Sequence, residues 1–317
     1  MKHCRNDHYR LLRQFLSLLA LLLAGCGKEP SAPPKTAGHI SHPAATETSG
    51  IAASRRTKDL LWIHNDSAGQ PVLYAIGTDG RLRGSMRVAG IKNIDWEDLA
   101  SFELDGQAWL LIADTGDNSG NRKNCALYVI AEPDLTGITA GQELTATVAW
   151  KIPVVYPDGA HDCEAVAVDA REETVFLITK RTTPPKLYSL PLRTPITNQP
   201  ATATLVTHLH DIPQPNSRQK ILPTPTGRYR ALVTAMDIAP DRLSATVLTY
   251  GDVLFYYRRP GEPWSTVFSR SPEVLAPHGL PQAEAVCYSA DSASLYVTGE
   301  RKNPLLLNYS LPVRARE

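Results

Sequence analysis

Three glutamates open copies of one short recurring phrase, and their chemistry depends on whether the copies meet in space. Glu97-Asp-Leu-Ala, Glu164-Ala-Val-Ala and Glu284-Ala-Val-Cys are three copies, and the other two begin at Ser49 and Met236. Carboxylates gathered in one place can bind a hard cation such as Ca²⁺ or help to activate water on a metal. The repeat therefore predicts an acidic site, provided that the fold collects the starts of the phrases.

The spacing of the copies predicts the elements that position these acids. The equivalent apolar residues of the five copies are separated by 48, 67, 72 and 48 residues, and they are Ile51, Leu99, Val166, Ile238 and Val286. Alternating apolar segments and turn residues follow each copy, which indicates about four strands in each repeat. Repeats of this length are typical of propeller blades. We therefore predict an all-β fold, a β-propeller of five four-stranded blades.

The last repeat ends after three strands. We expect the segment 39–46 to supply the missing outer strand and to close the ring, and a strand at 264–269 to form the outer edge of the fourth blade. A propeller of six blades is the alternative, because residues 216–229 could contain a degenerate pair of strands.

A propeller brings the start of each first strand and the end of each second strand to one face. The residues that we expect to bind a ligand at this channel mouth are Glu97, Asp114, Glu164, Lys180, Glu284 and Glu300. The acids repel one another unless they are neutralised. One neutraliser is Ca²⁺, for which the expected ligands are Asp114, Asp117, Glu97 and Glu164. The alternative is pairing with basic side chains, namely Lys180, Arg181, Arg122 and Arg301, which would leave no metal and no other cofactor.

Two further interpretations of the mouth stay open. The glutamates could be architectural and accept backbone N–H bonds from neighbouring blades. Catalysis would need a base, for which His64 and His161 are candidates, but the sequence has no Gly-x-Ser-x-Gly elbow and its catalytic residues remain unknown. Because Ser49 and Met236 interrupt the set of acids, we expect an asymmetric site between the second, third and fifth blades.

The N-terminus predicts export. Residues 1–25 have a basic start followed by an apolar segment at 15–23, as in a signal peptide. The segment Leu23-Ala24-Gly25-Cys26 resembles the bacterial lipobox, which implies a lipidated (palmitate-bearing) Cys26; an ordinary signal peptide is the alternative. Residues 26–38 would form a flexible tether, and 39–317 a single propeller domain. The expected location is the cell envelope, facing the periplasm, and Gly27 favours the outer membrane over the inner one.

Charge and cysteines limit the partners and the cross-links. The net charge of the chain is +1 and it has no long basic run, which argues against a nucleic-acid partner. An oxidising compartment permits a disulfide between Cys125 and Cys163, which precede strands in adjacent repeats. Cys287 occupies a repeat position that is otherwise Ala, so we expect it in the core.

Three segments resemble a group of exported bacterial β-propeller lipoproteins, largely uncharacterised, which are distantly similar to phytase-like, esterase-like and lactonase-like propellers. The segments are 95–100, 112–122 and 156–166. The resemblance implies the propeller fold over about residues 45–312 and, from the phytase-like members, Ca²⁺ held by Glu97, Asp114, Glu164 and Glu284. The chain departs from these groups in having no cluster of lysines for several phosphates and no Glu-Gly-Pro phrase.

Two functions compete. The first is an envelope-anchored scaffold, attached to the membrane through Cys26, that binds a small molecule or another envelope protein, with Ca²⁺ as a candidate ligand at its mouth. The alternative is a Ca²⁺-dependent hydrolase of phosphoester, ester or lactone bonds.

Overall fold

The computed structural model describes residues 31–67, 69–139, 141–193, 200–222 and 227–311. The chain divides into two units, Met1–Ser31 and Ala32–Glu317. All of the described strands belong to the second unit, whereas the predicted signal peptide and Cys26 lie outside the described residues. Within the described ranges, no helix is long and apolar enough to cross a membrane.

The described strands form five antiparallel units of four strands. The first comprises β2 (Thr48–Ala53), β3 (Leu60–Asn65), β4 (Val72–Gly77) and β5 (Leu82–Ala89). The second comprises β6 (Trp96–Leu104), β7 (Gln107–Asp114), β8 (Ala126–Ala131) and β9 (Glu143–Val155). The third comprises β10 (Cys163–Asp169), β11 (Thr174–Thr179), β12 (Lys186–Pro191) and β14 (Thr204–His208).

The fourth and fifth units complete the set. The fourth comprises β15 (Val233–Ile238), β16 (Ser244–Thr249), β17 (Val253–Tyr257) and β18 (Glu273–Val274). The fifth comprises β19 (Ala283–Tyr288), β20 (Ser294–Gly299), β21 (Leu305–Ser310) and the N-terminal β1 (Lys35–His39). A parallel pairing of β5 with β9 joins the first two units, and β13 (Ala201–Thr202) pairs in parallel with β9. The predicted all-β propeller fold is confirmed.

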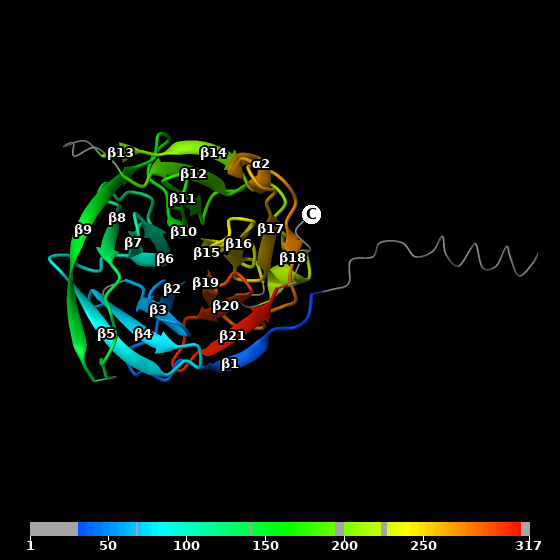
Figure 1. Ribbon diagram of the computed structural model, residues 1–317. Helices are drawn as coiled ribbons and strands as arrows, with labels where there is room; N and C mark the ends of the chain where they lie inside the picture. The colour runs from blue at the N-terminus through cyan, green and yellow to red at the C-terminus, as the bar shows by residue number, and fades with distance from the viewer. Residues whose placement is uncertain (1–30, 68, 140, 194–199, 223–226, 312–317) are drawn as a thin grey trace, which may run out of the picture. The chain divides into compact units, whose positions relative to one another are not determined.

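The first strands of the units lie at the centre of the ring (Figure 1). Each contacts the first strand of the next unit, from β2 through β6, β10 and β15 to β19, and β19 contacts β2 again. The antiparallel pairing of β1 with β21 joins the first and the last described strands in one sheet. Residues at the starts of the five first strands are therefore brought together, although they are far apart in the sequence.

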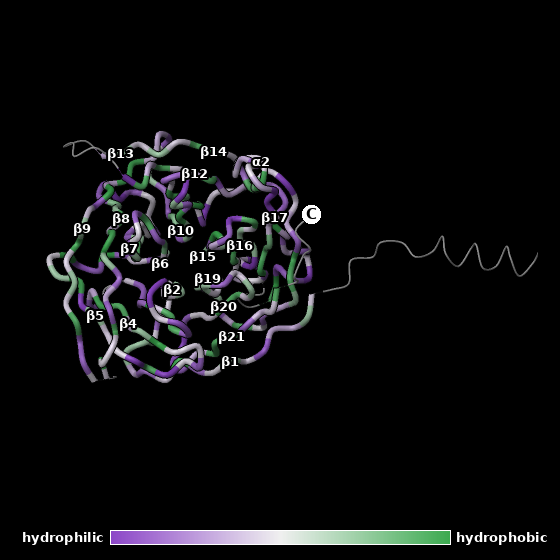
Figure 2. The backbone as a smooth tube through the Cα atoms, in the orientation of Figure 1, coloured by the Kyte–Doolittle hydropathy of each residue, from purple (hydrophilic) through white to green (hydrophobic). Residues whose placement is uncertain are grey.

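The hydrophobic core consists of layers between neighbouring units. Trp62 and Met86 of the first unit pack with Leu110 and Ile130 of the second, and similar clusters lie between every other pair of neighbours. Figure 2 shows hydrophobic residues along strands such as β8. Both faces of most strands are thus buried, because each sheet has another sheet on either side.

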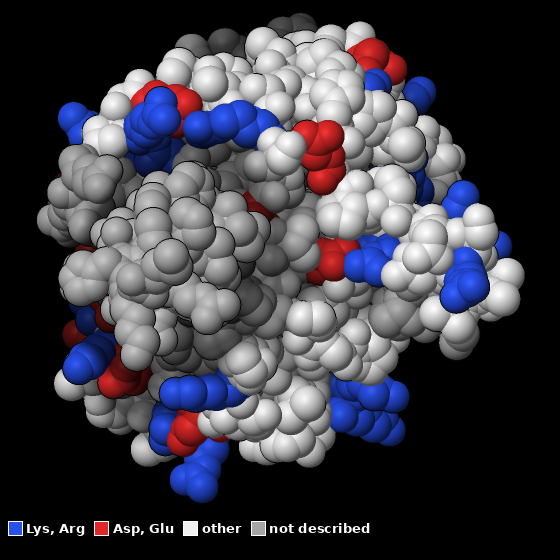
Figure 3. Space-filling view, turned by 90° about the vertical axis from the view of Figure 1, so that its right-hand side faces the viewer, with Lys and Arg blue, Asp and Glu red and all other residues white. Residues whose placement is uncertain are grey.

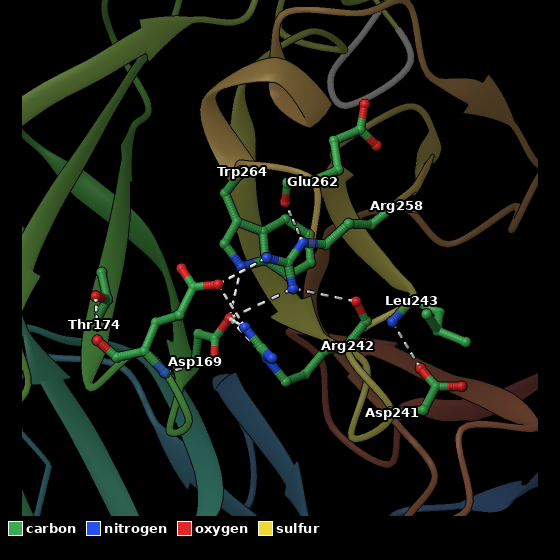
Figure 4. A network of polar contacts seen from close by, with 9 residues as sticks. Asp169, Thr174, Asp241, Arg242, Leu243, Arg258, Glu262 and Trp264 are labelled. Carbon is green, nitrogen blue, oxygen red and sulfur yellow. Dashed lines mark hydrogen bonds and ion pairs between the residues drawn. The ribbon is translucent and has the colours of Figure 1, made fainter. Parts of the chain in front are cut away.

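Polar ties reinforce these layers. Asp169, at the end of β10, accepts hydrogen bonds from Trp264 Nε1 at 2.7 Å and from Arg242 Nη2 at 2.8 Å, both in the fourth unit (Figure 4). Burial opposes ionisation of Asp169, but Arg242 and Trp264 outweigh it and lower the pKa of this carboxyl group. The tie therefore joins the third and fourth units while Asp169 is ionised.

Two predicted strands differ from the structure. The closing strand is Lys35–His39 and not 39–46, so residues 35–38, which we expected in the tether, belong to the propeller. Pro43 has no N–H to donate to a ladder, which disfavours the predicted segment. The segment 264–269 is mainly helix α2 (Trp264–Phe268), and β18 forms the outer strand. Trp264, Val267 and Phe268 are its buried residues, and their spacing is helical.

The region considered for a sixth blade contains no strand in its described part. Residues 216–222 include the short 3₁₀ helix η1 (Gln219–Ile221), and residues 227–229 form part of a turn. Residues 223–226 lie outside the described residues.

Candidate functional site

Every first strand begins with a β-bulge at the centre of the ring. The ladder with the second strand skips one residue at this point, and the skipped residues are Ser49, Glu97, Glu164, Thr234 and Glu284. A bulge leaves a residue unpaired and re-aims its side chain. The three predicted glutamates therefore occupy one equivalent position, and each is buried, with only 3–4% of its surface exposed. We call these five positions and the adjoining ends of the second strands the mouth.

The fourth copy of the phrase is not where the sequence pattern places it. The bulged residue is Thr234, two residues before the predicted Met236, which lies within the ladder. A shift by two residues preserves the alternation of strand faces, so the apolar pattern does not detect it. Thr234 donates its hydroxyl to Ala283 O at 2.8 Å, and Ser49 donates to Glu97 O at 2.6 Å. These two hydroxyls tie one unit to the next.

The second strands contribute a second set of side chains. After the last paired residue of each second strand come Asp66, Thr115, Lys180, Tyr250 and Glu300. Asp114 was expected in this set, but it pairs with Trp96 and is itself the last paired residue of β7. A one-residue shift in a strand turns the side chain to the opposite face.

Asp114 and Asp117 consequently hold a loop together and do not join the other acids. Asp114 Oδ1 accepts a hydrogen bond from Arg122 Nη2 at 2.6 Å, and Asp117 accepts one from the Arg122 backbone N at 2.7 Å. Neither aspartate belongs to a group of converging ligand atoms in the described residues. The expected metal site on Asp114 and Asp117 is thus not assembled, whereas Glu97 and Glu164 do meet.

The third, fourth and fifth units surround a buried lysine. Lys180 forms an ion pair with Glu164 and donates to Tyr250 OH at 3.1 Å. Burial alone would lower the pKa of Lys180, but the carboxylates of Glu164 and Glu284 outweigh it and raise that pKa. Burial raises the pKa of Glu284 to about 7, against the opposing effects of Lys180 and of a hydrogen bond with Tyr250.

The first and second units contribute a group of acids. One carboxylate oxygen from each of Asp66, Asp95 and Glu97 lies within 4.8 Å of the other two. Burial raises the pKa of Asp95 to about 6, and the charge of Asp66 adds to the shift. Burial, reinforced by Glu164 and Asp66, raises the pKa of Glu97 well above its usual range. We call this set the Asp66 group.

Gly116 allows the loop after β7 to approach these acids. A Cβ atom at this position would lie 2.0 Å from Glu97 Oε1 and 2.6 Å from Asp95 Oδ2. Any side chain would therefore collide with the two carboxylates. The Gly116 backbone N donates to Asp95 O at 3.2 Å, which holds the loop against the group.

A second group of acids shares Glu97 with the first. Oxygens of Glu97, Asp162 and Glu164 lie within 4.8 Å of one another. Asp162 pairs with Arg181 Nε at 2.6 Å and accepts a hydrogen bond from the Asp117 backbone N at 2.8 Å. We call this set the Asp162 group. Unlike the Asp66 group, it has basic side chains paired with two of its members.

Glu300 lies at the edge of this arrangement. It is half-buried and accepts a hydrogen bond from Gln282 Nε2 at 2.8 Å. Burial raises its pKa, and the charge of Asp66 contributes, so Glu300 lies in the same electrostatic field. Arg301, the neutraliser expected beside it, forms no ion pair within the described residues.

The architectural role expected of the glutamates belongs to other acids. Asp98 accepts backbone N–H bonds from Val166 at 2.8 Å and Met236 at 3.2 Å, which links three units. Asp237 accepts one from Tyr288 at 2.8 Å. The carboxylates of the bulged glutamates accept no backbone bond in the described residues, which leaves them for other partners.

The two histidines and the cysteines also have definite places. Burial lowers the pKa of His64 to about 4, so it is neutral at pH 7. His161 Nε2 lies 3.0 Å from Asp158 Oδ1, outside both acid groups. Cys125 and Cys163 are buried free thiols, which corrects the predicted disulfide. Burial raises their pKa values, and they pack between the second and third units.

Four residues of the mouth, namely Asp66, Asp95, Asp162 and Tyr250, were not among the expected ligand-binding residues. The strand pattern of the sequence does place Asp66 and Tyr250 at the ends of their second strands, in the position of Lys180, and the structure has them there. Asp95 and Asp162 each lie two residues before a bulged glutamate, and this spacing was the available sign.

Comparison with known proteins identifies no family. No family model and no curated protein matches the chain. A gluconolactonase from Xanthomonas campestris is 13% identical, with a TM-score of 0.45 over 90% of this chain and 100% of that one. A candidate 6-phosphogluconolactonase from Bacteroides uniformis is 11% identical, with a TM-score of 0.39 over 84% and 68% of the two chains. U3-55K is 10% identical, with a TM-score of 0.39 over 83% and 68%. The chemistry of the mouth is therefore inferred from its own residues.

The raised pKa of Glu284 predicts a pH-dependent loss of stability in metal-free buffer. Unfolded Glu284 loses its proton near pH 4.5, whereas the folded protein retains it to about pH 7. In this window the folded state binds more protons, so the free energy of unfolding falls as pH rises. Glu284→Gln has no proton to lose there. From pH 5 to pH 8, the free energy of unfolding of the variant relative to that of the wild type should therefore rise by on the order of 2 kcal/mol, as measured by urea unfolding. An unchanged difference between the two proteins would contradict the raised pKa of the buried Glu284.

Proposed function

We propose that the mouth binds a divalent cation of the Ca²⁺ class through the Asp66 group. The protein would use this charged face, while anchored in the cell envelope, to bind a small molecule or another envelope protein. Ca²⁺ prefers several oxygen ligands and tolerates varied geometry. The three carboxylates supply such ligands, and a water or a ligand oxygen would complete the coordination.

The state of Glu97 supports the proposal most directly. This glutamate is 4% exposed and belongs to both acid groups, yet its carboxylate makes no hydrogen bond or ion pair in the described part of the chain. A buried carboxylate without a partner is costly, and it either keeps its proton or binds a cation. Asp66 and Asp95 lie beside it and have no basic partner among the described residues.

Isothermal titration with Ca²⁺ at pH 7.5 tests this proposal. The wild type should bind the ion, and Glu97→Gln should weaken binding at least about tenfold, a loss of about 1.4 kcal/mol. Glu103→Gln is the matched control, because Glu103 lies on the same strand but is exposed. Absence of Ca²⁺ binding by the wild type, or equal binding by Glu97→Gln, would refute the proposed site.

Hydrolysis is the second candidate function. A carboxyl group whose pKa is near 7 can accept a proton at neutral pH, and Glu284 has this property beside Lys180 and Tyr250. Glu284 would serve as the base toward a water molecule, and Asp66, Asp95 and Glu97 would hold a cation that could supply Lewis-acid chemistry. Lactones, carboxylic esters and phosphoesters are the substrate classes to assay with and without Ca²⁺. Turnover that needs Ca²⁺ and is lost in Glu284→Gln would establish this function; a panel with no turnover would leave binding alone.

The envelope location rests on the N-terminal sequence. The segment Leu23-Ala24-Gly25-Cys26 follows an apolar stretch and resembles a lipobox. We expect the wild type to take up labelled palmitate and to sediment with membranes, and Cys26→Ala to do neither. Equal labelling of both proteins would show that Cys26 is not the attachment point.

A further inference from the structure

We infer that Lys180 is a built-in counter-ion that occupies the place of a second metal ion, so that the mouth binds one cation and not two. The inference rests on the proposed function, because it specifies how many ions bind and which acids hold them. It also assigns Lys180 a role in determining where the cation binds.

The two acid groups are equally able to converge on an ion. In each, three carboxylate oxygens lie within 4.8 Å of one another, and Glu97 is common to both. Oxygens at this separation can share one hard cation. Geometry alone would therefore allow two neighbouring sites that share Glu97.

The charges around the groups differ. Lys180 pairs with Glu164, and Arg181 pairs with Asp162, so two members of the Asp162 group already have a positive partner. The Lys180 side chain is 8% exposed and is fixed by Tyr250, whose hydroxyl lies 3.1 Å and whose ring centre lies 4.9 Å from Nζ. A fixed ammonium repels a metal ion, and the cost of dehydrating it falls on folding and not on metal binding.

The Asp66 group has no such ammonium. Lys180 is near enough to act on Asp66 and Glu97 through its charge, but it makes no ion pair with either in the described residues. Within the described residues, the buried Glu97 carboxylate has no hydrogen-bond or ion-pair partner, which points to a bound cation. Because Glu97 is common to both groups, it is the lack of a basic side chain paired with Asp66 or Asp95 that favours the Asp66 group. A single ion among Asp66, Asp95 and Glu97 would then neutralise the negative charge of the acids from the first and second units. Lys180 neutralises that of the acids from the third and fifth units.

Replacement of Lys180 should therefore open the second site. In Lys180→Met, the long apolar side chain keeps most of the volume, but Glu164 and Glu284 lose their ammonium. We expect Ca²⁺ titration to give one ion per chain for the wild type and two for Lys180→Met. Lys186→Met is the matched control: this lysine of the same unit pairs with Asp158 outside the mouth, and one ion is expected.

Each outcome of this titration has a separate meaning. A wild type that binds no ion refutes the proposed cation site itself. A wild type that binds one ion, together with a Lys180→Met protein that also binds only one, refutes the role of Lys180 and leaves the proposed site intact. Two ions in the wild type would show that Lys180 does not exclude the second.

Isosteric variants keep the inference testable if Lys180→Met does not fold. Asp95→Asn removes a ligand of the Asp66 group, so its Ca²⁺ binding should fall at least about tenfold. Glu164→Gln removes an acid of the Asp162 group only, so one ion should still bind with an affinity within about threefold of the wild type. Loss of binding in Glu164→Gln with retention in Asp95→Asn would place the ion in the Asp162 group and overturn the inference.

Discussion

Carboxylates buried around one opening repel one another, and each must be protonated, paired with a basic side chain or bound to a cation. All three solutions have a place at this mouth. Burial keeps the proton on Glu284 up to about pH 7. Glu164 and Asp162 are paired with Lys180 and Arg181. In the part of the chain that the structure describes, no basic side chain forms an ion pair with a member of the Asp66 group, and the proposed cation site follows from that difference.

The β-bulges bring the acids of the repeated phrase together at the mouth, and their negative charges repel one another there. A regular ladder would send alternate residues of the first strands into the layers between units, as it does for most of their length. At the bulge one residue leaves the ladder, and the propeller uses it for a hydroxyl tie at Ser49 and Thr234 or for an acid in the other units. On the one outer face that Figure 3 shows, by contrast, basic side chains are scattered among acidic ones.

The sequence was sufficient for the fold, because propeller repeats keep their apolar alternation and turn residues. It also identified Glu97, Glu164, Lys180 and Glu284 as neighbours. The predictions failed where the register of a strand decides which residue reaches the mouth. The sequence pattern placed the fourth copy of the phrase at Met236, two residues after the bulged Thr234. It also placed Asp114 at the mouth, although Asp114 is still paired and lies one residue before the position that reaches it. Pairing of charges, such as Arg122 with Asp114, depends on loop geometry that no local pattern encodes. The polar closing strand β1 has no apolar alternation by which to recognise it.

The most direct measurement is the crystal structure of the protein grown with Ca²⁺ or a lanthanide substitute, with the ion located by anomalous scattering. The proposed site predicts one peak among Asp66, Asp95 and Glu97, with carboxylate oxygens at roughly 2.3–2.6 Å and Lys180 still paired with Glu164. A mouth without a peak in the presence of the ion, or a peak held by Asp114 and Asp117 alone, would contradict it.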